Sequence, residues 1–89
     1  MTKTQKSILI VEDDSGISHI LELKLKSAGY ATTLVSGGEA ALTALKKTKF
    51  NLMLLDLRMP GMDGFMVLQT MRKHKDTTPV IVCSVLSQD

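Results

Sequence analysis

Three apolar segments of the chain each end at polar side chains that could take part in chemistry. The segments and the residues that follow them are 8–11 with Glu12 and Asp13, 52–55 with Asp56, and 80–83 with Ser84. If the segments are parallel strands of one sheet, their carboxyl ends lie at one edge, where such sheets bind ligands. Carboxylates held close together repel one another unless a cation or a proton is present. The sequence therefore predicts an acidic pocket with a hydroxyl group beside it.

The predicted pocket offers oxygen atoms as ligands. Oxygen ligands favour a hard cation that keeps some of its water, so Mg²⁺ is expected before Zn²⁺. A single aspartate in such a site can attack a phosphoryl group and form an aspartyl phosphate, while the metal neutralises charge on the transferred group. Ser84 could then donate a hydrogen bond to a phosphoryl oxygen. Asp56 is the candidate nucleophile because no helix begins directly after it, whereas Asp14 and Asp63 are interpreted as helix caps.

The elements that would position these residues follow from the hydrophobic pattern. Short apolar segments alternate with segments of helical periodicity, which predicts successive βαβ units and a parallel sheet in one domain, residues 1–89. Strands are predicted at 7–11, 31–35, 51–55 and 80–85. Helices are predicted to begin near Asp14 or Ser15, at a capping box of Ser36 and Glu39, and near Asp63. The pattern is (βα)₃β.

The first predicted helix has an apolar stripe with one local conflict. The stripe is predicted to consist of Ile17, Ile20, Leu21, Leu25 and Ala28. Lys24 falls inside this stripe and Leu23 falls outside it. The conflict indicates either a lysine that extends its charged end to solvent or a slightly rotated helix.

Composition and charge exclude several classes of protein. With 44% hydrophobic and 22% charged residues, the 89-residue chain is predicted to be globular rather than disordered. Its net charge of +2 comes without a basic stripe interleaved with aromatic residues, so no direct nucleic-acid binding is expected. No apolar run approaches the ~20 residues that cross a bilayer, and the first residues show no signal-peptide pattern. We therefore expect a cytoplasmic protein without membrane contact, whose single Cys83 is buried and inert.

Three motifs at their spacing resemble the receiver domain of two-component response regulators. They are ILIVEDD at 8–14, LLDLRMPGMDG at 54–64 and PVIVCS at 79–84. The resemblance covers essentially all 89 residues, and the combination of the three motifs is highly specific. It implies a flavodoxin-like, doubly wound parallel α/β sheet, with strand order 2-1-3-4 for the four strands present.

The resemblance also implies the function and the roles of individual residues. Asp56 would accept a phosphoryl group from a sensor histidine kinase, and Ser84 matches the hydroxyl residue that turns toward the phosphoryl group. Mg²⁺ would be held by Asp13, Asp56 and the backbone carbonyl of Arg58, with Glu12 acting through water. No enzymatic activity is expected beyond Mg²⁺-dependent self-phosphorylation and autodephosphorylation.

The chain departs from the resemblance at its carboxyl end. Receivers are expected to continue with a helix, a fifth strand bearing an aromatic switch residue, a lysine before a proline, and a last helix. We therefore expect a domain truncated after its fourth strand, without a counterpart of the phosphate-binding lysine. The outer edge of strand 80–85 is then expected to pair with a second copy, giving a homo-oligomer. Side chains expected to be partly exposed are Phe65, Met71, Ile81 and Cys83.

The same residues bear on three functions other than phosphoryl acceptance. A truncated receiver that no longer switches could serve as an oligomerising or interaction module. A phosphatase of the haloacid-dehalogenase type would need a second aspartate two residues after Asp56, where the chain has Arg58. A dinucleotide-binding fold would need a Gly-x-Gly-x-x-Gly motif after the first strand, and the chain has none there.

Overall fold

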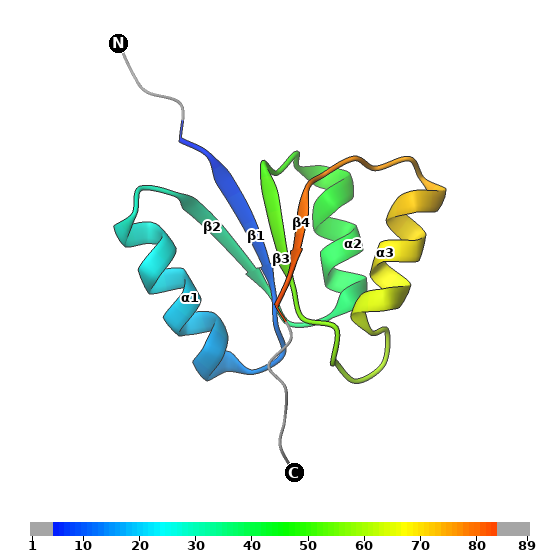
Figure 1. Ribbon diagram of the computed structural model, residues 1–89, viewed down its shortest axis with the longest axis horizontal. Coiled ribbons are helices and arrows are strands. Elements are labelled where there is room, and N and C mark those ends of the chain that lie inside the picture. Colours follow the sequence, from blue (N-terminus) through cyan, green and yellow to red (C-terminus); the bar gives the residue numbers. More distant parts are fainter. Residues whose placement is uncertain (1–4, 84–89) are drawn as a thin grey trace.

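Strands and helices alternate along the whole of the described chain. The computed structural model describes residues 5–83. The elements are β1 (Ser7–Val11), α1 (Ser15–Ser27), β2 (Ala31–Val35), α2 (Gly38–Lys47), β3 (Leu52–Leu55), α3 (Gly64–Lys73) and β4 (Val80–Val82). Figure 1 shows this succession, which confirms the predicted (βα)₃β pattern.

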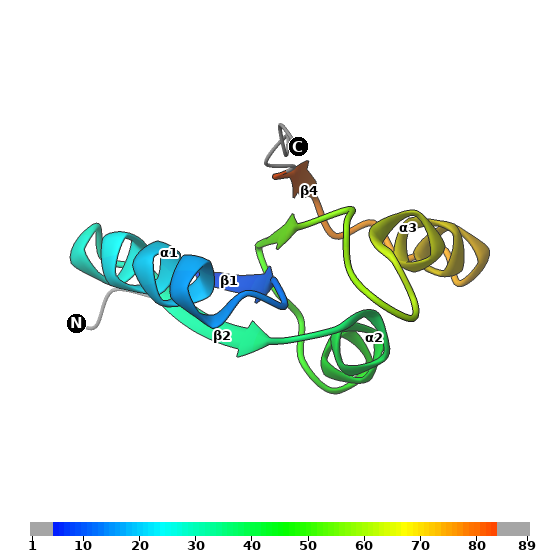
Figure 2. The same cartoon turned by 90° about the horizontal axis from the view of Figure 1, so that it is seen from below.

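The four strands form one parallel sheet in the order β2-β1-β3-β4, as predicted. Helix α1 lies on one side of the sheet, and α2 and α3 lie on the other (Figure 2). In the register of the sheet, Val11 is opposite both Val35 and Leu55, and Leu55 is opposite Val82. The last residues of all four strands are therefore level, so the segments that follow them emerge at one edge.

The main core lies between the sheet and the pair α2 and α3. Its buried side chains are Leu9, Val11, Ala41, Phe50, Met53, Leu55, Met59, Val67 and Met71. Alternation along β1 places Ile8 and Ile10 on the opposite face, where they are also buried. Complete burial of one such side chain contributes roughly 1.5–3 kcal/mol, so this central strand anchors the sheet from both faces.

Helix α1 is rotated relative to its predicted apolar stripe. Ile20, which was expected inside the stripe, is 55% exposed, and Ser18 is buried instead. Glu22 faces β2, where its carboxylate accepts a hydrogen bond from the Thr32 hydroxyl at 3.5 Å. Ile20 lies on the flank of α1 that stays exposed. Lys24 is exposed, as the rotated helix predicts, and Leu23, outside the predicted stripe, is 55% exposed as well.

Two of the three predicted helix starts are confirmed. Asp14 caps α1 by accepting a hydrogen bond from Ile17 N, and Asp63 caps α3 by accepting one from Met66 N, both at 3.0 Å. The capping box predicted at Ser36 and Glu39 is wrong, because α2 begins at Gly38 with Gly37 as a cap that makes no side-chain hydrogen bond.

Close packing explains where α2 begins. A Cβ atom on Gly38 would lie 2.6 Å from the carbonyl oxygen of Met62 and 2.9 Å from a methyl group of Val67. The first turn of α2 is thus pressed against the loop that precedes α3. This contact spans more than twenty residues of sequence, and local capping signals carry no information about it.

Strand ends and exposed side chains differ in detail from the predictions. β3 begins one residue later than predicted, because the Asn51 side chain accepts a hydrogen bond from Ser7 N at 2.7 Å. Ser84 and the remainder of the predicted strand 80–85 lie outside the described residues. Phe65 and Ile81 are exposed as expected, at 61% and 51%, whereas Met71 is buried in the core and was predicted wrongly.

Within residues 5–83 no helix is long and apolar enough to cross a membrane.

Candidate functional site

The acidic residues predicted to form a pocket follow two neighbouring strands. β1 and β3 are adjacent and in register, so Glu12 and Asp13 leave the sheet beside Asp56. The ladder continues one residue beyond the strands, because Glu12 N donates to Val35 O and Asp56 N donates to Val11 O, both at 3.1 Å. The backbone of this site is therefore held by the sheet rather than by free loops.

The three carboxylates converge on one point. One oxygen from each of Glu12, Asp13 and Asp56 lies within 4.8 Å of the others. Glu12 is buried, with 6% of its surface exposed, and Asp13 is exposed. Three acidic oxygens at this spacing suit a hard divalent cation that binds directly or through its own water, which is the usual arrangement for Mg²⁺. The geometry thus brings together the three predicted carboxylates.

Burial changes the acidity of this cluster. Desolvation raises the pKa of Glu12 from 4.5 to about 7, and repulsion by the charge of Asp56 adds to the effect. A hydrogen bond from Asp14 N to Glu12 Oε2, at 3.1 Å, opposes the rise in pKa by stabilising the carboxylate. The raised pKa means that Glu12 is partly protonated near neutral pH, and a cation that enters the cluster must compete with that proton.

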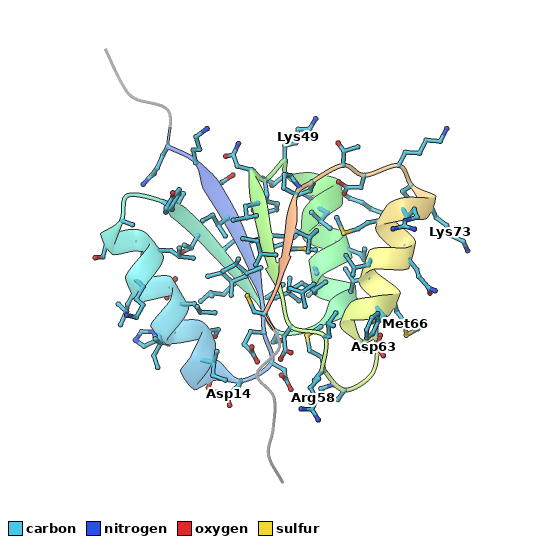
Figure 3. The ribbon with its side chains drawn as sticks, in the orientation of Figure 1. Asp14, Lys49, Arg58, Asp63, Met66 and Lys73 are labelled. Atoms are coloured by element: carbon cyan, nitrogen blue, oxygen red, sulfur yellow. The ribbon has the colours of Figure 1, made fainter. Side chains whose placement is uncertain are left out.

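The peptide of Arg58 orients the candidate nucleophile. Arg58 N donates a hydrogen bond to Asp56 Oδ1 at 3.0 Å, which holds the carboxylate against the turn that follows β3. Figure 3 places Arg58 at the same edge of the molecule as the capping residues Asp14 and Asp63. The predicted role of the Arg58 carbonyl as a metal ligand stays a prediction.

Gly64 is a part of the site that sequence reasoning did not single out. Its amide donates to Leu57 O at 3.3 Å, and a Cβ atom on it would lie 2.8 Å from Asp56 O and 2.7 Å from Leu57 Cα. Only glycine lets the start of α3 approach the backbone of Asp56 this closely. The sequence does contain a signal for this contact, because Gly64 directly follows the helix cap Asp63. A glycine at such a position often indicates that another backbone segment packs closely against it.

Cys83 marks where β4 meets the acidic edge. Cys83 N donates to Leu55 O at 2.8 Å, so the end of β4 lies beside the end of β3. Cys83 is partly exposed, as expected for a domain truncated after its fourth strand and not fully buried as its apolar segment alone predicts; burial together with the charges of Asp56 and Glu12 raises the pKa of its thiol. Ser84 comes next in the chain but lies outside the described residues, so its predicted position is untested.

Comparison with known proteins identifies the family. Residues 8–89 match the family model of the response regulator receiver domain. The chain is 40% identical over 83 residues to the probable transcriptional regulator ycf27 of Porphyridium aerugineum, covering 93% of this chain and 34% of that protein. It is 38% identical over 77 residues to the cell cycle response regulator CtrA of Brucella ovis, covering 86% and 33%. The chain spans about a third of the length of these relatives.

Solved structures agree with this result. The receiver domain of the Francisella response regulator 1452 superposes with a TM-score of 0.88 at 30% identity, covering 94% of this chain and 69% of that one. Thermotoga maritima TrrA, solved with Mg²⁺ and BeF, gives a TM-score of 0.87 at 32% identity, covering 93% and 72%. The chain belongs to the response regulator receiver family, and its sheet is the flavodoxin-like sheet of that family.

Proposed function

We propose that this receiver accepts a phosphoryl group on Asp56 from a sensor histidine kinase, with Mg²⁺ bound by the acidic cluster. The observation that carries the proposal is the convergence of three carboxylates at the ends of β1 and β3. Asp13, Asp56 and the Arg58 carbonyl are the proposed ligands, and Glu12 acts through water. The complex of TrrA with Mg²⁺ and BeF supports this assignment by analogy.

The proposed transfer is a displacement at phosphorus. An oxygen of Asp56 forms a bond to phosphorus as the bond from phosphorus to the donor's imidazole nitrogen breaks, and the released imidazole takes up a proton from water. Bound Mg²⁺ would neutralise charge on the transferred group. The Arg58 amide, 3.0 Å from Asp56 Oδ1, fixes one carboxylate oxygen so that the other is free to attack. Ser84 is proposed to donate a hydrogen bond to the phosphoryl group after transfer.

Hydrolysis of the aspartyl phosphate returns the protein to its starting state. We propose no other catalytic activity for this chain.

The test of phosphoryl acceptance is labelling from a small-molecule phosphodonor in Mg²⁺, followed by measurement of the intact mass. Asp56→Asn keeps the shape of the side chain and should abolish labelling, whereas Asp63→Asn, which alters a helix cap outside the cluster, should not. Labelling of Asp56→Asn at the parental level would contradict the proposal.

A second proposed function is association with another copy through β4. Ile81 and Val82 are 51% and 45% exposed, and within residues 5–83 no strand pairs with the outer side of β4. An unpaired edge of β-branched residues favours pairing with another strand, most simply antiparallel about a two-fold axis. The receiver would then also act as an assembly module.

The direction of the amides allows a selective test of this association. Cys83 N points to β3, so alternation turns Val82 N toward the outer edge. Val82→Pro should therefore remove an edge donor and give a monomer in sedimentation, while the β3 ladder stays intact. Ile81→Pro, which removes a donor to β3, is the control for damage to the fold. A monomeric parent at high micromolar concentration would rule out the association.

A further inference from the structure

The edge of the sheet opposite the acidic cluster is basic. Lysine and arginine side chains gather where the helices end: Lys24, Lys26, Lys46, Lys47, Lys49, Arg72, Lys73 and Lys75. Figure 3 shows Lys49 and Lys73 at this edge, far from Asp14 and Asp63 at the other. Cations in the last turn of a helix are explained by the helix dipole. Lys49 and Lys75 are not explained in this way, because both lie beyond the last helical residue.

A hollow of about 650 Å³ opens between the ends of α2 and α3 and the beginnings of β3 and β4. We call it the basic hollow. The residues that line it and bear on its chemistry are Thr48, Lys49, His74, Lys75, Thr77 and Thr78. They supply two cations, an imidazole and the hydroxyl groups of Thr48 and Thr77, which can donate hydrogen bonds to an anion, whereas the Thr78 hydroxyl donates to Asp76.

Negative charge within the basic hollow is already engaged. Asp76 is the single carboxylate among its lining residues, and its Oδ1 accepts hydrogen bonds from Thr78 N at 2.9 Å and from the Thr78 hydroxyl at 2.7 Å. Among the described residues both ion pairs are made by Glu22, on α1. Lys49 and Lys75 therefore face the hollow without a carboxylate within 4 Å in the described part of the chain.

Lys75 occupies a backbone conformation that disfavours lysine. Its φ is +56°, and it closes α3 in a turn where Asp76 N donates to Met71 O at 2.9 Å. Glycine is the usual residue at this position of a helix end, because a Cβ atom is strained there. Strain at a residue other than glycine is often found where a side chain has a function. At this position the lysine adds positive charge to the basic hollow.

An apolar slot adjoins the basic hollow. The slot has a volume of about 120 Å³ and lies between α2 and α3; its apolar lining is Leu42, Leu45 and Met71, and its polar lining is Lys46, Thr70, His74 and Asp76. It shares Leu45, His74 and Asp76 with the basic hollow, so the two are neighbours. Together, the basic hollow and the slot place an apolar wall beside a few cationic groups. This is the composition of a site for a small ligand.

We propose that the basic hollow and its slot bind a small phosphate-bearing organic anion of the nucleoside monophosphate class. The phosphate lies between Lys49 and Lys75 and accepts hydrogen bonds from the hydroxyls of Thr48 and Thr77. The ring lies in the slot against the side chains of Leu45 and Met71. This site is at the opposite edge of the sheet from Asp56, so it stands independently of phosphoryl acceptance.

Calorimetric titration with AMP tests the proposal. Inorganic phosphate at matched ionic strength is the comparison. AMP should bind saturably and at least about tenfold more tightly than phosphate, because only AMP fills the slot. The double variant Lys49→Gln and Lys75→Gly should weaken AMP binding by about tenfold or more. Lys75→Gly also relieves the strained backbone, so loss of folding is not expected to confuse the result.

A charge-matched double variant separates a defined site from general attraction. Lys6→Gln and Lys24→Gln remove two exposed lysines outside the basic hollow and should change AMP affinity by less than about twofold. The proposal is overturned if AMP and phosphate bind equally, if neither binds at millimolar concentration, or if both double variants lose AMP affinity alike. Duplex DNA that binds more tightly than AMP and is released equally in both double variants would instead assign this edge to polyanion attraction.

Discussion

The two edges of the sheet hold their charges in different ways. At the acidic edge, three carboxylates converge within 4.8 Å on a backbone fixed by the sheet, and burial raises the pKa of Glu12 to about 7. At the basic edge, the lysines extend from helix ends around an open hollow. Like charges brought together destabilise a fold, whereas charges that are spread and solvated cost little. The acidic edge is therefore expected to respond strongly to mutation, pH and Mg²⁺, and the basic edge only weakly.

The largest effect is expected from closing the space between Gly64 and the backbone of Asp56. Gly64→Ala places a Cβ atom against the backbone of Asp56 and Leu57, which must move, at a cost of about 2–3 kcal/mol in the free energy of unfolding. Urea denaturation measures the loss. Gly37→Ala is the matched control, because a Cβ atom there has no atom within 4 Å, and its cost should be below about 1 kcal/mol. Equal losses in the two variants would contradict the close approach.

Removing the charge of Glu12 should stabilise the protein at high pH. Because the pKa of Glu12 is raised from 4.5 to about 7, the folded state binds the proton more tightly than the unfolded state does. The free energy of unfolding therefore falls as pH rises through this interval. Without Mg²⁺, Glu12→Gln should be more stable than the parent by about 1–3 kcal/mol above this interval, and the difference should vanish below it. Urea denaturation at several pH values in EDTA measures this. A difference independent of pH would contradict the raised pKa.

Mg²⁺ should stabilise the parent and not a variant with an incomplete donor set. At a concentration about tenfold above its dissociation constant, a ligand that binds only the folded state adds about 1.4 kcal/mol to the free energy of unfolding. Asp13→Ala should abolish this gain. The measurement is Tm in millimolar Mg²⁺ against EDTA for both proteins. An identical rise in Tm for the two would place Mg²⁺ elsewhere.

The smallest effect is expected at the basic edge, and its sign is opposite to that of most mutations. Lys75→Gly should stabilise the chain by about 1 kcal/mol, because glycine adopts the positive φ without strain. Lys73→Gly, within the last turn of α3, should cost about 1 kcal/mol instead. The midpoint of urea denaturation distinguishes the two. Destabilisation by both variants would show that Lys75 stabilises the turn through its side chain.

Features set by local pattern could be predicted from the sequence. The alternation of strands and helices, the strand order and the caps Asp14 and Asp63 follow from hydrophobic period, family motifs and cap chemistry. The meeting of Glu12, Asp13 and Asp56 followed as well, because the carboxyl ends of parallel strands share one edge.

Features set by contacts distant in the sequence could not be predicted. The first residue of α2, Gly38, packs against Met62 and Val67, which come after β3 in the sequence. The exposure of Ile20 depends on the rotation of α1 toward β2, and the raised pKa of Glu12 depends on how deeply the sheet edge is buried. Hydrophobic period shows which side chains prefer burial, but not how far neighbouring elements cover them.

The extension of the hydrogen-bond ladder beyond the strands has a consequence for amide exchange. Glu12 N and Asp56 N donate to Val35 O and Val11 O, so these two protons can exchange with solvent only when the end of the sheet opens. Cys83 N, bonded to Leu55 O, should exchange slowly as well, whereas Val82 N on the outer edge should exchange fast in the monomer and slowly once β4 pairs with a second copy. Asp56, the proposed phosphoryl acceptor, is thus tied to the end of the sheet, so its backbone should stay in place during fluctuations that would disorder a free loop.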